Sequence, residues 1–274
     1  MTAISSQFVS WDGGCVFLSG RSPGVTPMHA HYAIQLAFGV EPGIRFRPGD
    51  AEPWTAYRGV VIPSRQPHTM DATGVSASAV LFVEPETREG RALAERFAGG
   101  GIAPLPDDVL DALAPSVFSA WRDARSAGAV EDAARRLVHA LAGGAAPSVV
   151  SDERILRAVA YIKAHLDRPL ALEEVAAEAC LSPSRFRHLF VEETGVGLRP
   201  YVLWRRFLRV WELLTRGSSL SAAAHAAGFA DAAHLSRTSR TMFGFPPSAM
   251  QMVGPLDAHA PAAASATQPL RSTA

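Results

Sequence analysis

The stretch AAGFADAAHLSRTSRTMFGFPPSAM, residues 226–250, contains the signals of a short turn between two helices. Gly228 stands where the end of a helix favours a left-handed residue, and Asp231 can accept a hydrogen bond from the first turn of the next helix. Leu235 is the apolar residue that this second helix would bury. Its exposed face would carry small, polar and basic side chains, namely Ala232, Ala233, Ser236, Arg237 and Arg240. The pattern predicts a helix-turn-helix unit over residues 219–241.

A second stretch with the same organisation lies upstream in PLALEEVAAEACLSPSRFRHLFVEE, residues 169–193. A short helix with a narrow apolar face leads to a turn. Ser182 is a good N-cap for the next helix, and Pro183 falls at the first helical position, where its missing N–H costs nothing. The outward face of that helix would show Ser184, Arg185, Arg187 and His188. We predict a first helix-turn-helix unit over residues 172–191, whose second helix can enter a major groove.

Residues 199–216 between the two units are predicted to form one long helix with a single apolar stripe. The stripe consists of Trp204, Phe207, Leu208, Trp211 and Leu214. At 1.5 Å per residue the connector is roughly 25 Å long and can hold two recognition helices about one DNA turn apart. Residues 184–240 contain nine arginines and four acidic residues, although the whole chain has a net charge of zero. This asymmetry is expected when one domain contacts phosphates; the alternative is two helical hairpins in an ordinary bundle.

Together, residues 152–250 resemble the DNA-binding domain of AraC-type transcription regulators, and residues 226–250 are similar to the signature of that family. The matching positions are Gly228, Phe229, Asp231, His234, Leu235, Ser236, Arg237, Arg240, Phe243, Gly244 and Pro247. Ser239 stands where the family usually has a buried Phe, and Thr241 replaces a common Arg. Val191 and Glu192 stand where the first unit often carries basic residues. These departures favour a weaker intrinsic affinity for DNA.

The resemblance implies which side chains reach DNA. The first recognition helix would use Ser184, Arg187 and His188, with Arg185 beside them, and the second Ala232, Ala233, Ser236 and Arg237, with Arg240 beside them. Arg187 and Arg237 are the best candidates for bidentate contact to guanine, and contact to phosphate is the alternative for each. The alanines can offer only apolar contact, for example to a thymine methyl group. We expect His234 to be structural, at the start of its helix.

The N-terminal half has a different pattern. Short apolar runs between residues 11 and 83 are separated by turns rich in proline and glycine, which predicts a small barrel or sandwich of β-strands. From residue 86 to residue 142 the apolar period is helical. Residues 146–151 are expected to be a linker, and the tail over residues 254–274, which has few large apolar side chains, is expected to be disordered.

Two segments of this half resemble the cupin motifs. The first contains His29, His31 and Gln35, and the second, GVVIPSRQPH, ends at His68. His29 and His31 lie two residues apart and so on the same side of a strand, and with Gln35 and His68 they could form a metal site. AraC-type regulators commonly carry a cupin-like domain that binds a small molecule without catalysis. We therefore predict an effector-binding site of His29, His31, Gln35, Arg45 and His68, with no metal, no cofactor and no catalytic residue, and keep a metal-binding cupin protein or enzyme as the alternative.

The predicted fold is thus two-domain. Residues 1–145 would form a cupin-like β-barrel with a helical dimerisation segment over residues 107–142, and residues 152–253 an all-α domain with two helix-turn-helix units. The expected partners are promoter DNA, a small-molecule effector, RNA polymerase and a second copy of the chain; an adaptor that binds a protein partner is a further alternative. No apolar run reaches the 18 residues of a membrane span, the N-terminus has no signal-peptide pattern, and Cys15 and Cys180 are far apart, so we expect a cytoplasmic protein with free thiols.

Overall fold

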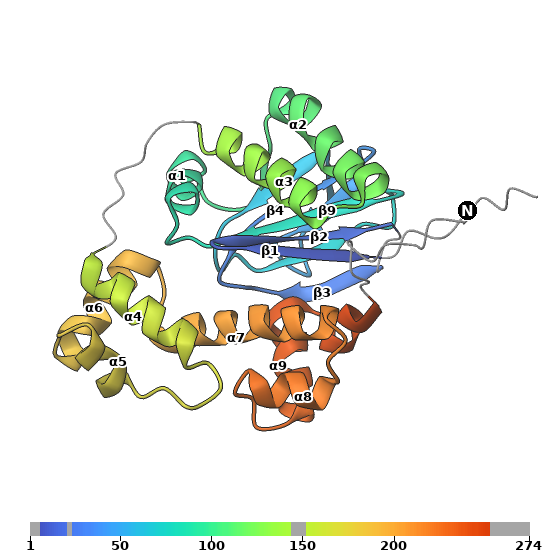
Figure 1. Ribbon diagram of the computed structural model, residues 1–274. Coiled ribbons are helices and arrows are strands. Elements are labelled where there is room, and N and C mark those ends of the chain that lie inside the picture. Colours follow the sequence, from blue (N-terminus) through green and yellow to red (C-terminus); the bar gives the residue numbers. More distant parts are fainter. Residues whose placement is uncertain (1–5, 21–23, 144–151, 253–274) are drawn as a thin grey trace, which may run out of the picture.

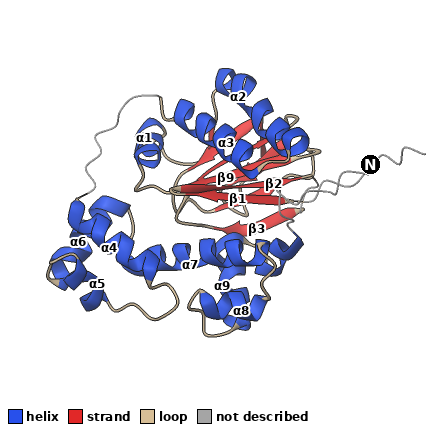
Figure 2. Ribbon diagram, viewed as in Figure 1, coloured by secondary structure: helices blue, strands red, loops and turns tan. Residues whose placement is uncertain are grey.

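A computed structural model describes residues 6–20, 24–143 and 152–252 of the chain (Figure 1). The predicted linker over residues 146–151 and the predicted tail over residues 254–274 lie outside these described residues. All strands lie in the N-terminal part of the described chain, together with three helices, and the C-terminal part described is helical, as Figure 2 shows by colour. The expected division into a β-rich and an all-α part is confirmed.

The strands of the N-terminal half form two antiparallel sheets. The first holds, in spatial order, β1 (Gln7–Trp11), β2 (Gly14–Ser19), β9 (Ser78–Val83), β4 (Ile34–Gly39), β7 (Gly59–Ile62) and β10 (Ala103–Pro104). The second holds β3 (Val25–His29), β8 (His68–Asp71), β5 (Ile44–Arg47) and β6 (Thr55–Tyr57). Among the described strands the two sheets share no ladder, so the expected barrel is not closed. Helices cover two of the open edges instead, because α3 and α7 contact β1 and α9 contacts β3.

Three helices follow the last long strand. They are α1 (Arg88–Arg96), α2 (Asp107–Ser119) and α3 (Ala127–Leu141), with a π-helical turn over Ala120–Ala124 between the last two. α3 buries Val130, Leu137 and Leu141 in a core that it shares with α2 and with one face of the six-stranded sheet. These two helices form the segment that the sequence predicts as the dimer contact. Their inward faces are taken up by the sheet, so only their outward faces remain for a partner (Figure 1).

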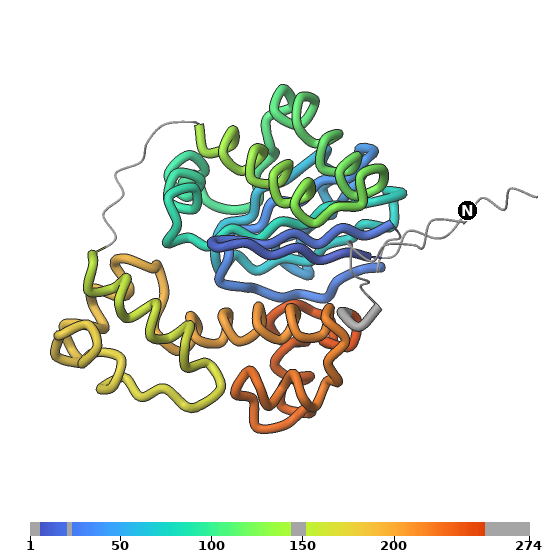
Figure 3. The backbone as a smooth tube through the Cα atoms, viewed as in Figure 1, coloured from blue at the N-terminus to red at the C-terminus, as the bar shows by residue number. Residues whose placement is uncertain are grey.

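The C-terminal half consists of two similar helical units joined by one long helix (Figure 3). The first unit contains α4 (Glu153–Ala164), α5 (Leu172–Glu178) and α6 (Pro183–Thr194), the connector is α7 (Leu198–Thr215), and the second unit contains α8 (Leu220–Ala226), α9 (Ala232–Phe243) and a 3-10 helix (Pro247–Met252). The predicted caps form, since Ser182 accepts from the backbone N–H of Arg185 and Asp231 from that of His234.

The connector α7 lies against the β-sheet, and its aromatic side chains pack on phenylalanines of that sheet. The ring of Trp211 lies 4.9 Å from Phe17 between centroids, and the ring of Trp204 lies 5.6 Å from Phe82. Both tryptophans are fully buried and belong to one apolar cluster that contains residues of both halves. Phe17 and Phe82 project from the face of the six-stranded sheet opposite the α3 core, because side chains alternate along a strand. The second sheet covers only part of this face, and α7 covers another part.

Buried polar groups cross the same interface. Glu84, directly after β9, accepts a hydrogen bond from Trp204 Nε1 at 3.0 Å and forms an ion pair with Arg205. On the N-terminal side of this interface, Tyr32 donates its hydroxyl hydrogen to Glu86. Burial, and then the negative charge of Glu84, raise the pKa of Glu86 to about 7. The positive charge of Arg205 is thus shared between the neighbouring carboxyl groups of Glu84 and Glu86. Of these two, Glu86 holds a proton more tightly than an ordinary glutamate.

Replacement of Trp211 by Ala should destabilise both halves together. The loss of a fully buried indole should reduce the free energy of unfolding by about 3–5 kcal/mol. Hydrogen exchange would be followed separately in β2 and in α8, and both should lose protection by the same factor. Leu156→Ala, at a side chain that is 50% exposed, is the control and should change little. Loss of protection in α8 alone would show that the two halves unfold independently.

Glu86 should make the stability of the chain depend on pH. Its folded pKa of about 7 lies above the ordinary value of 4.5, so the folded state binds the proton more tightly. The stabilising effect of protonation is complete below about pH 4.5 and is lost as the pH rises through 7. Relative to Glu86→Gln, the wild-type free energy of unfolding should therefore fall by at least about 1 kcal/mol between pH 5 and pH 7.5. A difference that stays constant with pH, measured by urea unfolding, would contradict this assignment.

Candidate nucleic-acid interface and histidine cluster

The second helix of the first unit, α6, presents the predicted recognition face to solvent. Ser184, Arg185, Arg187 and His188 are all exposed. On the opposite side of the helix Phe186 and Phe190 are fully buried and anchor it to the rest of the unit. The helix begins at Pro183 after the Ser182 cap and ends at Gly195, whose φ of 78° is left-handed.

The second helix of the second unit, α9, presents a smaller set of polar groups. Ala233, Arg237 and Arg240 are exposed, while Ala232 and Ser236 are half-buried. The hydroxyl of Ser236 donates to the carbonyl oxygen of Ala232 at 2.8 Å, so its donor is used inside the helix. The arginines are thus the strongest groups that α9 can offer to DNA.

His234 and Ser239 both make contacts within their own unit, although the side chain of His234 is exposed. The backbone N–H of His234 donates to Asp231, and its ring packs edge-on against Phe229 at 5.6 Å. Ser239 is fully buried, as expected for a core position, and its hydroxyl donates to the carbonyl oxygen of Phe245 at 2.8 Å. The polar atom that replaces the usual aromatic side chain is therefore satisfied, which limits its cost.

The turns of the two units have the same hydrogen-bond pattern. In the first unit the N–H of Leu181 donates to Ala176 O at 3.0 Å, and in the second the N–H of Phe229 donates to Ala224 O at 2.9 Å. The residue before each donor is left-handed, with a φ of 52° at Cys180 and 74° at Gly228. A cysteine rarely adopts this conformation, so the sequence signal that identifies the turn at Gly228 is missing at Cys180.

The arginines of the two recognition faces have no carboxylate partner. Within the described part of the chain, no ion pair involves Arg185, Arg187, Arg237 or Arg240, whereas Arg91, for example, is held by Glu193 at 2.7 Å. Unpaired guanidinium groups on two exposed helices form a surface that attracts phosphates.

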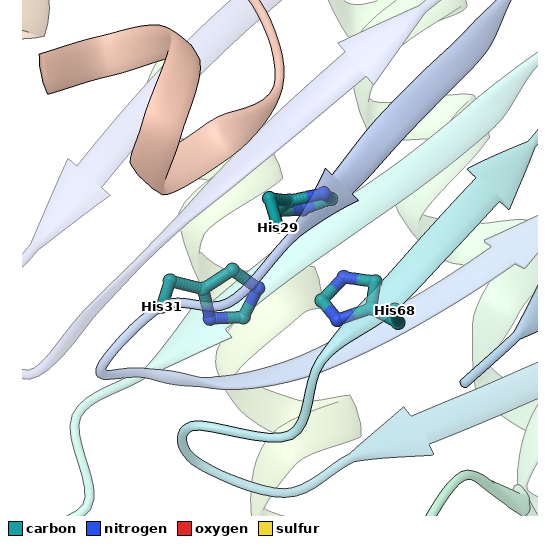
Figure 4. Close-up of side chains that lie close together, drawn as sticks. All are labelled: His29, His31 and His68. Atoms are coloured by element: carbon teal, nitrogen blue, oxygen red, sulfur yellow. The ribbon is translucent and has the colours of Figure 1, made fainter. Parts of the chain in front are cut away.

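The three histidines of the predicted effector site lie together between the two sheets (Figure 4). His29 ends β3, His68 begins β8 directly opposite it, and His31 lies in the loop before β4. The rings of His29 and His68 are 4.2 Å apart between centroids, and one ring nitrogen from each of the three histidines lies within 4.8 Å of the others. All three side chains are buried, and the side-chain amide of Gln35 lies 2.8 Å from Nε2 of His31.

The backbone fixes the orientation of all three rings. Nδ1 of His29, His31 and His68 lies 2.8, 2.8 and 2.9 Å from the carbonyl oxygens of Pro27, Ala33 and Gln66 respectively. A carbonyl oxygen can only accept, so each Nδ1 carries the hydrogen and each Nε2 is left as an acceptor, which in His31 is in contact with the side-chain amide of Gln35. Nε2 of His68 is buried without a partner. Burial, and then the neighbouring histidines, lower the pKa of His31 to about 4 and that of His68 to about 2, so these rings are neutral.

Arg45 does not join the cluster. Its neighbours Ile44 and Phe46 on β5 point inward, so alternation directs Arg45 outward, where it pairs with Asp71 and lies 5.8 Å from the ring of Trp54. The prediction that Arg45 lines the same site as the histidines is wrong.

Comparisons with known proteins agree with this geometry. A family model described as a helix-turn-helix domain matches residues 175–252. The regulatory protein PocR of Salmonella typhimurium is 31% identical over 111 residues, which is 40% of this chain and 37% of PocR. The arabinose operon regulatory protein of Escherichia coli is 32% identical over 102 residues, which is 35% of this chain and 34% of that protein. The match thus spans little more than a third of these relatives.

The similarity of fold extends further. A crystal structure of ToxT from Vibrio cholerae covers 91% of this chain and 98% of its own with a TM-score of 0.56, at 11% identity. Both domains therefore have the ToxT arrangement. No helix among the described residues is long and apolar enough to cross a membrane. The chain is thus similar to AraC-type transcription regulators in its helix-turn-helix domain, and its two-domain fold is similar to that of ToxT.

Proposed function

We propose that the chain binds specific promoter DNA through the exposed faces of α6 and α9, and that a ligand of the N-terminal domain controls this binding. The observation that carries the proposal is the set of unpaired arginines on two equivalent helices of one rigid frame. Arg187 and Arg237 are the candidates for base contact, and Arg185 and Arg240 for phosphate. Ser184 and His188 add polar groups on α6, whereas Ala232, Ala233 and Ser236 shape the surface of α9.

Control by a ligand is supported by the shared interface. Because α7 is buried against β2 and β9, a displacement of these strands changes the packing of the helix that joins both recognition units. The similarity to these relatives does not identify the ligand that this chain binds. We keep the outward faces of α2 and α3 as the proposed dimer contact and RNA polymerase as a proposed partner, on the likeness to the family.

Arg237→Ala should weaken binding to a duplex that the full-length wild-type chain selects from a random DNA pool. The loss of a base contact should cost about 1–3 kcal/mol, or roughly 5- to 150-fold in affinity. Arg187→Ala should have a similar effect, and Arg58→Ala, at a surface arginine of the N-terminal domain, is the control. The full chain is used because residues 152–252 alone would expose the aromatic face of α7. Equal affinities of Arg237→Ala and Arg58→Ala, measured by fluorescence anisotropy, would rule out this role.

A second candidate function, metal binding, is favoured by the histidine cluster. Three neutral imidazoles whose Nδ1–H groups are held by backbone carbonyls, and whose Nε2 atoms are therefore acceptors, have the form that a divalent transition metal requires. A metal would replace the present contact between Nε2 of His31 and Gln35. Gln35 is next to His31 and could supply an oxygen as a fourth ligand. A metal would also give the buried Nε2 of His68 the partner that it lacks. We propose that Zn²⁺ or a similar ion is the ligand of this domain.

Metal binding predicts a specific stabilisation. The chain, freed of metal by dialysis against a chelator, should bind one Co²⁺ or Zn²⁺ per molecule, with a Co²⁺ absorption spectrum typical of nitrogen ligands. At a free metal concentration about 100 times Kd, the free energy of unfolding should rise by about 2.7 kcal/mol. His68→Ala should remove both effects, and His139→Ala, at an exposed histidine of α3, should keep them. If the wild-type chain shows neither stoichiometric metal nor stabilisation, the cluster is only a buried histidine core.

A further inference from the structure

Arg206 lies near the middle of α7, and its guanidinium group reaches the loop that leads into the first helix-turn-helix unit. Nε donates to the carbonyl oxygen of Leu166 at 3.1 Å, and Nη2 donates to that of Arg168 at 2.8 Å. Both carbonyl groups belong to the loop between α4 and α5. One planar side chain thus satisfies two acceptors of a loop that has no regular secondary structure.

The turn of the second unit lies on the other side of the same guanidinium group. Gly228, at the end of α8, has a φ of 74°, and a Cβ atom added there would lie 2.2 Å from Leu166 O and 2.8 Å from Arg206 Nη2. Both distances are far below van der Waals contact, so only glycine permits this approach. The loop of the first unit, Arg206 and the turn of the second unit therefore meet at one point.

This junction is narrow. Beside it the two units are separated by a cavity of about 610 Å³, whose lining includes Lys163 and Asp167 from the first unit and His225 from the second. The loop itself is held firmly, because Arg168 forms an ion pair with Glu174 and a hydrogen bond with Tyr161 at 2.8 Å. The loop touches both Arg206 and Gly228 and so fixes the second unit relative to the first. The two units do not pack on each other across the cavity, so this contact sets their relative position.

We infer that Arg206 is a positioning residue that sets the distance and angle between α6 and α9, and so determines which spacing of two DNA half-elements the protein recognises. Burial lowers the pKa of Arg206, but its guanidinium group remains charged at neutral pH. The group is half-buried and its bonds are made inside the protein, so it acts through the two units and not through contact with DNA. The inference rests on the proposed binding of DNA by both units.

The test compares duplexes that differ in spacing. The wild-type full-length chain selects a duplex from a random pool, footprinting defines its two half-elements, and variants with one base pair removed or with one or two base pairs inserted between them are prepared. One base pair shifts a half-element by about 3.4 Å and rotates it around the duplex. Wild-type affinity should fall about tenfold or more for each shifted duplex, because the rigid frame can no longer engage both half-elements.

Arg206→Lys keeps the charge but lacks the planar fork that reaches both carbonyl groups. It should bind the selected duplex about tenfold more weakly and should discriminate less than about threefold between spacings, while binding to a duplex with one half-element scrambled stays within about twofold of wild type. Gly228→Ala, which forces the turn away from Leu166, should flatten the spacing preference in the same way. Arg209→Lys, at an exposed arginine three residues along α7, is the matched control and should leave the preference unchanged.

The outcomes separate the inference from the function on which it rests. If Arg206→Lys and Gly228→Ala both retain the wild-type spacing preference, Arg206 does not position the units, whatever the change in affinity. If Arg206→Lys does not fold, as judged by circular dichroism, the result for Gly228→Ala decides. If the wild-type chain selects no duplex at all, the proposed DNA binding itself is wrong.

Discussion

The packing of α7 against the six-stranded sheet is the interaction on which the rest of the structure depends. The sheet exposes a strip of aromatic residues that the second sheet does not cover, and Trp204 and Trp211 fill it. At about 25 cal/mol per Å² of apolar surface, such a contact is far stronger than the polar interface of two loosely joined domains. The helix that connects the two DNA-binding units is therefore also part of the core of the N-terminal domain, and neither half has a complete core without the other.

This shared core gives a physical route from the histidine cluster to the DNA-binding helices. The ring of His31 lies 4.8 Å from Phe82 between centroids and 6.4 Å from Phe243, and Phe82 in turn packs on Trp204. Phe243 is the last residue of α9, and the next residue, Gly244, lies so close to β3 that a Cβ atom there would be 2.7 Å from Thr26. A ligand that moves His31 would have to displace aromatic rings that belong to α7 and α9, because cores at this packing density cannot absorb the movement locally.

Much of this arrangement could be predicted from the sequence. The features that were predicted wrongly or missed have identifiable physical reasons. Local signals were sufficient for both helix-turn-helix units and for the apolar stripe of α7, whereas the grouping of His29 and His31 with His68 came from the resemblance to the cupin motifs. Alternation along a strand does not say which face is inward, which is why Arg45 was assigned to the wrong side of β5. Phe17 and Phe82 belong to strands that are buried on both faces. In such strands the apolar residues do not alternate with polar ones, so the sequence does not show that one face packs on α7. The role of Arg206 depends on two carbonyl groups about forty positions away, which no spacing reveals.

The two helix-turn-helix units have the same turn geometry but differ in the polar groups that their second helices expose. α6 exposes two arginines, a serine and a histidine, whereas on α9 the hydroxyl groups of Ser236 and Thr241 donate to their own helix. The first unit therefore has the richer set of groups that could contact bases. The second unit has instead the closer tie to the N-terminal domain, because the end of α9 lies over β3 beside His31. Under the proposed function, sequence would be read mainly by α6 and the ligand would act mainly through α9, with Arg206 fixing the position of one unit relative to the other.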